Sequence, residues 1–343
     1  LSGGEKQKIA FASVYATQPE VLVLDEPSSN LDMAAVAELT RLLQKVKAQG
    51  KTIIVAEHRL WYLMEVADRV IYMESGRVAR DMATSEFRAL TERETSALSL
   101  RCRDLAQIAQ TETHTNKKSN LFEVRGLSVH LGNKHVLKQV EFTAYGGEVI
   151  AIAGPNGVGK TTLARTLCGL QKCDVGTIAQ NGQVLSEKQR KARSYMVMQD
   201  VNFELFADSV EAECSFGIRN PDKSLIETTM DSLGLLPYRT HHPNTLSGGQ
   251  KQRVAVAVSM ICGKELLVFD EPTSGLDFDS MEQVALLIQK LSAMGKVIFV
   301  VTHDYEFVCR TCSRVLHIDH GEQCDDLPLV PDNEENLKKL FSI

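Results

Sequence analysis

The segment that most constrains the fold is Gly154–Thr161, whose residues are Gly-Pro-Asn-Gly-Val-Gly-Lys-Thr. It follows the apolar run 149–153 and precedes 163–168, which can continue as a helix. A strand, a glycine-rich turn and a helix in this order form a phosphate-binding loop, because backbone N–H groups of the turn point at the phosphates. In such a loop Lys160 reaches the β- and γ-phosphate oxygens, and the Thr161 hydroxyl ligates Mg²⁺. We therefore expect the chain to bind a nucleoside triphosphate.

The composition narrows the class of protein. The chain has 343 residues, enough for two domains. Its 43% hydrophobic and 24% charged residues are typical of a globular protein. The formal net charge of −6 argues against a protein that binds nucleic acid through phosphate attraction. Because no apolar run is long enough to cross a bilayer, the sequence predicts no membrane-spanning helix.

The two ends of the chain resemble each other at a constant offset of 245 residues. Equal spacing without gaps predicts two copies of one domain. At this offset the counterpart of Lys160 would lie about 85 residues before Leu1, so we expect the first copy to be truncated at its N-terminus. The matching segments are Leu1–Lys8 with Leu246–Arg253, Asp25–Asp32 with Asp270–Asp277, and His58 with His303.

Hydrophobic patterning predicts an α/β fold. The run 21–24 is wholly apolar, which is typical of a buried parallel strand that ends in ligand-binding residues. We expect the following elements: apolar strands at 21–24, 52–55, 70–73 and 195–198, an antiparallel hairpin at 122–129 and 136–144, and helices at 2–16, 33–49 and, with a break at Asn220-Pro221, 209–236.

Composition also suggests where the domains meet. The polar, unpatterned stretch 110–120 is the expected linker between residues 1–109 and 121–332, with a short polar tail at 333–343.

Cys309 and Cys312 have C-x-x-C spacing, but no second pair completes a zinc site. We expect these thiols to pack in a helix and to remain reduced, as in the cytosol.

Together these motifs resemble those of ATP-binding-cassette (ABC) ATPases with two cassettes in one polypeptide. Leu-Ser-Gly-Gly stands 24 residues before an apolar-Asp-Glu motif in both copies, which is a specific combination. The segment Gln199–Val210 resembles the region after the Q-loop of energy-coupling-factor transporter ATPases, which power uptake of vitamins and metal ions. Glu57–Leu60 is similar to the first cassette of fused members of that group. The resemblance implies a P-loop NTPase fold with a parallel-sheet core, an antiparallel β subdomain and an α-helical subdomain.

The resemblance also implies roles for individual residues. A γ-phosphate in transfer needs a metal, cations, hydrogen-bond donors and one oriented water. Glu271 would polarise the water, His303 would contact the γ-phosphate, and Gln199 would touch Mg²⁺ and link the site to a membrane partner. The remaining expected site residues are Glu26 and His58 as catalytic counterparts in the first copy; Gly154, Pro155, Asn156, Gly157, Val158, Gly159, Lys160, Thr161 and Thr162 for the ATP phosphates; and Thr161, Gln199, Asp270 and Asp25 for Mg²⁺.

Cassettes of this family pair head to tail, so that one Leu-Ser-Gly-Gly segment covers ATP held by the other cassette. Ser2, Gly3 and Gly4 would then complete the site built on Lys160, and Ser247, Gly248 and Gly249 would complete the site whose loop is missing. Leu131, beside His130, stands where many cassettes carry an aromatic residue that stacks on adenine. We therefore expect weak base selectivity, with GTP competing for the site.

Three functions are compatible with the sequence. The favoured one is the motor subunit of an importer, peripheral to the cytoplasmic face of the membrane and bound to a separate integral membrane subunit. The solute stays open among cobalt, nickel, biotin, thiamine and others. The alternatives are a non-transport ABC ATPase of the translation-factor or DNA-repair type, and a non-enzymatic regulatory module. The short connection between the copies and the acidic charge disfavour the former, and intact Lys160, Asp270 and Glu271 disfavour the latter.

Overall fold

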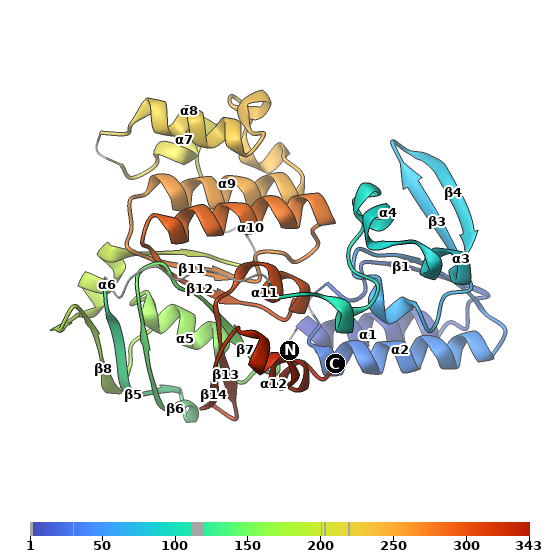
Figure 1. The fold of residues 1–343 in the computed structure, drawn as a ribbon, viewed down its shortest axis with the longest axis horizontal. Helices are drawn as coiled ribbons and strands as arrows, with labels where there is room; N and C mark the ends of the chain where they lie inside the picture. The colour runs from blue at the N-terminus through green and yellow to red at the C-terminus, as the bar shows by residue number, and fades with distance from the viewer. Residues whose placement is uncertain (1–2, 30, 111–119, 200, 202–203, 219) are drawn as a thin grey trace. The chain divides into compact units, whose positions relative to one another are not determined.

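The computed structural model describes residues 3–29, 31–110, 120–199, 201, 204–218 and 220–343. Two compact units make up the chain (Figure 1). The first unit comprises residues 1–108 with 275–279 and 341–343, and the second comprises 109–274 and 280–340. Most of the expected linker 110–120 lies outside the described residues.

A six-stranded sheet forms the centre of the second unit, in the order β10-β11-β12-β7-β13-β14. Its first five strands run parallel, and β14 pairs with β13 antiparallel. Every residue of the three apolar strands β7, β11 and β12 is buried, as the wholly apolar runs predict. The strand bounds are Val149–Ala153 for β7, Ser194–Val197 for β10, Leu266–Asp270 for β11, Val297–Val301 for β12, Arg314–Asp319 for β13 and Glu322–Pro328 for β14.

An antiparallel sheet of order β6-β5-β8-β9 packs on this core. It contains the expected hairpin, β5 (Phe122–Leu131) and β6 (Lys134–Ala144), followed by β8 (Val175–Gln180) and β9 (Gln183–Val184). Phe299 of β12 meets the rings of Phe122 and Phe142 edge-on, with centroids 6.3 and 5.6 Å away. These aromatic contacts join the two sheets in one hydrophobic core.

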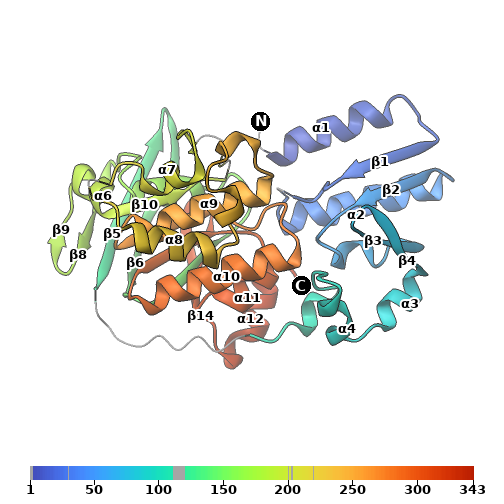
Figure 2. The same cartoon turned by 90° about the horizontal axis from the view of Figure 1, so that it is seen from above.

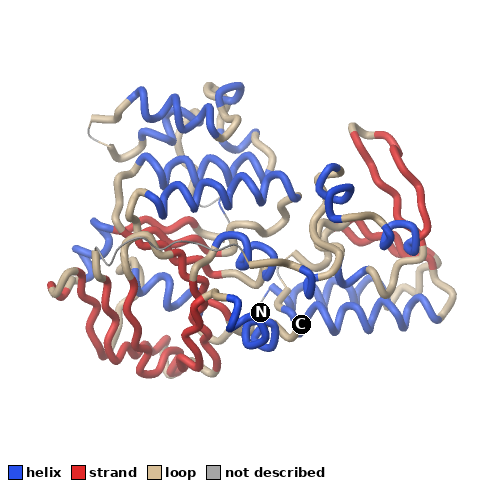
Figure 3. The backbone as a smooth tube through the Cα atoms, viewed as in Figure 1, coloured by secondary structure: helices blue, strands red, loops and turns tan. Residues whose placement is uncertain are grey.

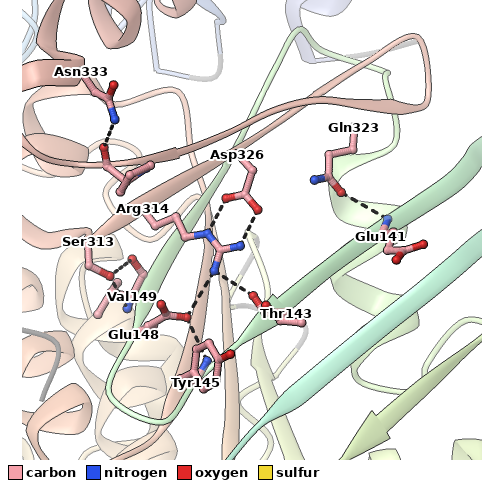
Figure 4. A network of polar contacts seen from close by, with 11 residues as sticks. Glu141, Thr143, Tyr145, Glu148, Val149, Ser313, Arg314, Gln323, Asp326 and Asn333 are labelled. Carbon is pink, nitrogen blue, oxygen red and sulfur yellow. Dashed lines mark hydrogen bonds and ion pairs between the residues drawn. The ribbon is translucent and has the colours of Figure 1, made fainter. Parts of the chain in front are cut away.

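A polar network reinforces the same junction (Figure 4). The Arg314 guanidinium of β13 forms a two-pronged ion pair with Asp326 of β14. It also donates to the carbonyl oxygen of Thr143 at 2.8 Å and to Glu148 Oε2 at 3.4 Å. Since Thr143 lies on β6 and Glu148 immediately precedes β7, the Arg314 side chain links β13 to β14, to β6 and to the start of β7.

Helices cover the second unit's sheet and build a separate helical layer. Figure 1 shows α7 and α8 beyond α9, against which both helices pack. The break expected at Asn220-Pro221 separates α7 from α8, which begins after its N-cap Asp222. The tail is not simply polar, because Leu337 of α12 is fully buried. The helix bounds are Lys160–Leu167 for α5, Glu187–Arg193 for α6, Val210–Ser215 for α7, Lys223–Ser232 for α8, Gly248–Ile261 for α9, Phe278–Ala293 for α10, Tyr305–Thr311 for α11 and Glu334–Leu340 for α12.

The first unit contains two separate two-stranded sheets, the parallel pair β1–β2 and the antiparallel pair β3–β4 (Figures 2 and 3). Helix α2 packs with Val36 and Leu43 in a core that includes Tyr62 and Phe87. The elements are α1 (Gly3–Tyr15), β1 (Val21–Asp25), α2 (Met33–Ala48), β2 (Thr52–Ala56), β3 (Arg69–Glu74), β4 (Arg77–Ala83), α3 (Thr84–Ala89) and α4 (Glu92–Ala97).

Five elements of the first unit have counterparts in the second whose bounds are displaced by 245 residues: β1 and β11, β2 and β12, β3 and β13, β4 and β14, and α2 and α10. The strand registers are displaced equally, since Val21 pairs with Thr52 as Leu266 pairs with Val297. The sequence offset is therefore also an offset of secondary structure.

The prediction that 21–24 is a buried strand is wrong in one respect. The strand forms, but Val21 and Val23 on one of its faces are 51% and 69% exposed, whereas Leu22 on the other is buried. The cause is what packs on each face. Leu266 and Val268, the counterparts of Val21 and Val23, are buried in one core with residues of α5, β5 and β6, and the described part of the first unit has no counterparts of these elements.

Cys309 and Cys312 pack as expected. Both are free thiols and fully buried, Cys309 within α11 and Cys312 directly after it. Burial raises the pKa of the Cys309 thiol to about 12, so it stays protonated and unreactive. Among the described residues, no group of histidine, cysteine or acidic side chains has the arrangement of a metal site.

Candidate functional site

The glycine-rich loop lies between β7 and α5, at the carboxyl edge of the central sheet. Gly154 has a φ of +143°, and a Cβ there would lie 1.9 Å from the carbonyl oxygen of Ile318. Gly159 has a φ of +111°, and its Cβ would lie 2.9 Å from a Leu137 methyl group. Both the backbone conformation and the space exclude larger residues, so the loop can follow this path only with glycine at these positions.

Lys160 is the first residue of α5 and only 6% exposed. Its ammonium donates to the carbonyl oxygens of Gly154 and Pro155, both at 2.8 Å. The loop backbone thus binds the ammonium group of Lys160. Phosphate oxygens are stronger acceptors than these carbonyls, so the ammonium can exchange such contacts for a triphosphate without leaving its place.

Thr161 and Asp270 bring two hard oxygen donors together beside the loop. The Thr161 hydroxyl donates to Asp270 Oδ2 at 3.0 Å, and Asp270 ends β11 with 4% of its surface exposed. Burial raises the pKa of the Asp270 carboxyl, and the Thr161 hydrogen bond and the Lys160 charge oppose that shift. A hydroxyl and a carboxylate are ligands that Mg²⁺ prefers, so Thr161 and Asp270 could hold a magnesium ion beside the loop.

Glu271 follows Asp270 and faces His303, which follows β12. His303 Nε2 lies 3.6 Å from Glu271 Oε1 and 2.9 Å from Asn156 Oδ1 on the loop. Thr302 donates to the second Glu271 oxygen at 3.4 Å. Glu271 also adopts a φ of +50°, an unfavourable conformation for a residue with a side chain, and its N–H donates to the Val301 carbonyl. Such strain is typical of residues whose position serves a reaction.

The first unit repeats this arrangement without a glycine-rich loop. Glu26 has a φ of +43°, its N–H donates to the Ala56 carbonyl at 2.8 Å, and its Oε1 lies 3.5 Å from His58 Nε2. Asp25 ends β1 as Asp270 ends β11. The side chains are more exposed here: His58 and Glu26 are 40% and 35% exposed, against 9% and 11% for His303 and Glu271. Partial burial raises the pKa of Glu26, and His58 opposes that shift.

The Leu-Ser-Gly-Gly segments lie at helix starts. Ser247 caps α9 by accepting the Gln250 N–H at 3.4 Å, while the Gln250 side chain accepts the Ser247 N–H at 2.8 Å. Gly248 and Gly249 form the first turn of α9. Gly3 and Gly4 begin α1 in the same way, and Ser2 lies outside the described residues.

The remaining expected residues lie at strand ends or on α5. Gln199 lies just past β10, on the side of β11 opposite β12, and is exposed. Thr162 is half-buried on α5. Leu131 ends β5 and is 46% exposed, next to a His130 ring that stacks on His135 with centroids 4.2 Å apart. The structure thus groups the loop, Asp270, Glu271 and His303 in the second unit, and Asp25, Glu26 and His58 in the first.

Sequence reasoning missed a network beside His58. Glu57 accepts three backbone N–H groups, including that of Ser28, and the Tyr62 hydroxyl at 2.8 Å. Buried Arg59 donates to the carbonyl oxygens of Ser28 and Leu31 at 3.5 and 3.3 Å. The available signal was an acidic and a basic residue flanking the histidine, where the second copy has Thr302 and Asp304.

No helix in the described part of the chain has the length and apolar character needed to span a bilayer. A family model described as "ABC transporter" matches residues 1–29 and 137–274. An ABC transporter ATP-binding protein of Treponema denticola is 51% identical over 333 residues, which cover 95% of this chain and 68% of that protein. A second one from this organism is 40% identical, with 96% and 68% covered. One from Methanosarcina acetivorans is 33% identical, with 95% and 63% covered.

Solved structures show the same fold. The structure of cbiO1 from Clostridium perfringens, part of the ABC transporter complex cbiONQ, has a TM-score of 0.56 at 26% identity and covers 65% of this chain and 91% of that one. An ATP-bound bacterial Atm1-family ABC exporter has a TM-score of 0.58, covering 69% and 43%; at 19% identity it shows the fold alone. The fold, the phosphate-binding loop and the 51% identical relative together show that the chain belongs to the ABC transporter ATP-binding proteins, which are ATPases.

Proposed function

We propose that this chain is part of the ATP-hydrolysing motor of an importer of the energy-coupling-factor type. The observation that carries the importer assignment is its likeness to cbiO1, a component of the cbiONQ complex, together with the sequence of Gln199–Val210. In this function the chain binds the cytoplasmic face of the membrane through a separate integral subunit and acts by closing and opening paired cassettes. The exporter likeness is too distant to favour export.

The second part of the proposal is that the chain carries one complete cassette and part of another. In the second unit, β7 pairs with both β12 and β13, and it leads into the phosphate-binding loop. In the first unit, β2 and β3 belong to separate sheets. A strand equivalent to β7 would pair with 53–56 on one side and 69–72 on the other, joining them as β7 joins β12 and β13. In this proposal, such a strand would lead into a first phosphate-binding loop, as β7 leads into the loop of the second unit.

The geometry suggests how the second unit hydrolyses ATP. The loop N–H groups and Lys160 hold the phosphates, and Thr161, Asp270 and Gln199 would hold Mg²⁺, which neutralises charge as the γ-phosphate leaves. Glu271 accepts a hydrogen bond from the attacking water and orients it in line with the phosphate. His303, held between Glu271 and Asn156, donates to the γ-phosphate.

Closure of the site requires the opposing cassette. In the proposed pairing, Ser2, Gly3 and Gly4 cover ATP bound at Lys160, because the start of a helix offers unpaired N–H groups to an anion. Ser247, Gly248 and Gly249 would serve the site of the first cassette in the same way. Each hydrolysis would then separate the two cassettes and move the membrane subunit.

Cell fractionation tests the transport function. The intact gene is expressed with and without its integral membrane subunit, and the protein is followed by immunoblot. We expect it in the membrane fraction only when that subunit is present. Sedimentation with ribosomes in both cases would contradict the proposal and favour a non-transport ABC ATPase.

A further inference from the structure

The segment after β10 contains an acidic side chain that the proposed mechanism does not use. Glu204 accepts the backbone N–H of Met198, the residue immediately before Gln199. The other carboxyl oxygen of Glu204, Oε2, is shielded from solvent and has no hydrogen-bond partner among the described residues. Burying a charged carboxylate with one oxygen unpartnered costs free energy, and burying a neutral carboxyl in the same place costs less.

The groups that face Glu204 favour the neutral form. Glu213 of α7 is 4% exposed, and its Oε2 accepts the N–H groups of Phe206 and Ala207 at 2.8 and 2.7 Å. Asp270 at the end of β11 adds a second negative charge, and the third titratable neighbour is Tyr195 of β10, neutral at ordinary pH.

Burial is the main cause of the resulting shift. It raises the pKa of Glu204 to about 8, repulsion from Glu213 and Asp270 adds to it, and the Met198 hydrogen bond opposes it. This shift favours the protonated form of Glu204 at neutral pH. Ionisation would place a third negative charge beside Glu213 and Asp270 and would favour release of the side chain toward water.

We propose that Glu204 is a positioning residue for Gln199: by accepting the Met198 N–H, it fixes the backbone immediately before Gln199. The inference rests on the proposed role of Gln199 in hydrolysis. It makes the geometry of Gln199 dependent on one proton held at Glu204, five residues further along the chain.

The first test compares Glu204→Gln, which keeps a neutral acceptor of the same shape, with Glu204→Ala, which removes the acceptor. Single-turnover ATP hydrolysis is measured from pH 6 to 9.5. We expect wild-type turnover to fall severalfold between pH 7 and 9, Glu204→Gln to lack this fall, and Glu204→Ala to be slow throughout with ATP affinity retained. Identical pH profiles for wild type and Glu204→Gln would overturn the proposal.

The second test does not depend on hydrolysis. In the unfolded chain Glu204 loses its proton near pH 4.5, and in the folded chain near pH 8. The folded state therefore binds more protons in this window, and stability falls as pH rises through it. From about pH 5 to 8 the melting temperature of wild type should fall relative to that of Glu204→Gln. Above pH 8 the difference between the two melting temperatures should stay constant. Parallel curves throughout would contradict a neutral Glu204.

Amide hydrogen exchange at Met198 distinguishes this inference from the proposed function. Glu204→Ala should accelerate exchange at Met198, and Glu204→Gln should not. Suppose that Gln199→Ala hydrolyses ATP normally, while Met198 exchange is faster in Glu204→Ala and unchanged in Glu204→Gln. The proposed role of Gln199 in hydrolysis would then be wrong, but the hydrogen bond from Met198 to Glu204 would be confirmed. If Glu204→Ala leaves Met198 exchange unchanged, the positioning role itself is wrong.

Discussion

The first and second units contain the same strand pairs in different surroundings. Val23 on β1 is 69% exposed, whereas its counterpart Val268 on β11 is fully buried. Arg69 and Asp81 of β3–β4 pair as Arg314 and Asp326 of β13–β14 do, but the first pair lies at the surface. Because the matched elements are alike in sequence and register, the difference comes from β7 and the elements packed with it, which have no counterparts in the described part of the first unit.

The segments beside the two histidines differ in another way. In the second unit, the Asp304 carboxylate accepts the Thr273 hydroxyl at 2.8 Å and the Phe307 N–H at 3.2 Å. In the first unit, Arg59 occupies the position of Asp304 and holds the carbonyl oxygens of Ser28 and Leu31. The two units thus fix the segment after their Asp-Glu motif with side chains of opposite charge.

The largest expected contrast concerns the two glutamates. Glu271→Gln should keep ATP binding and lower single-turnover hydrolysis by about 10²-fold or more, because the water loses the group that accepts its proton. Glu26→Gln should lower it at most a few-fold in this chain, since the described part of the first unit contains no phosphate-binding loop. Equal losses for the two variants would show that both units hydrolyse ATP here, and unchanged hydrolysis in Glu271→Gln would reject its assigned role.

A smaller contrast concerns the two arginines. Arg314→Ala should destabilise the second unit by about 2–3 kcal/mol, because Asp326 and Glu148 lose their shared cation at a largely buried position. Arg69→Ala, its matched control, should leave the unfolding midpoint of the first unit unchanged, since Arg69 is 65% exposed. Urea unfolding followed by hydrogen exchange in each hairpin measures both. A midpoint shift in β3–β4 as large as that in β13–β14 would mean that Arg69 has partners comparable to those of Arg314.

Much of the fold was predictable because its determinants are local. The loop 154–161 and the run before it determine a strand, a turn and a helix within about 20 residues. The 245-residue offset predicted matching elements, and it holds in the structure to the residue for five of them. The hairpin of β5 and β6 follows from simple alternation.

What could not be predicted depends on contacts between distant segments. An apolar strand is buried on both faces only when other helices or sheets pack against both. The sequence of 21–24 does not indicate which elements pack there. The Glu57 and Arg59 contacts are made to loop carbonyls and N–H groups, whose directions no pattern specifies. Burial raises the pKa of Glu204, and Glu213 of α7 and Asp270 of β11, which the fold brings near it, add to that shift.

The number of ATP molecules bound per chain tests the central claim most directly. Among the described residues the glycine-rich phosphate-binding loop lies in the second unit alone, so we expect equilibrium dialysis to give one ATP per chain and Lys160→Ala to abolish that binding. Lys51→Ala, which removes a cation of the first unit paired with Glu20, serves as the control and should leave one ATP bound. Two ATP molecules per chain, or one that persists in Lys160→Ala, would contradict the account.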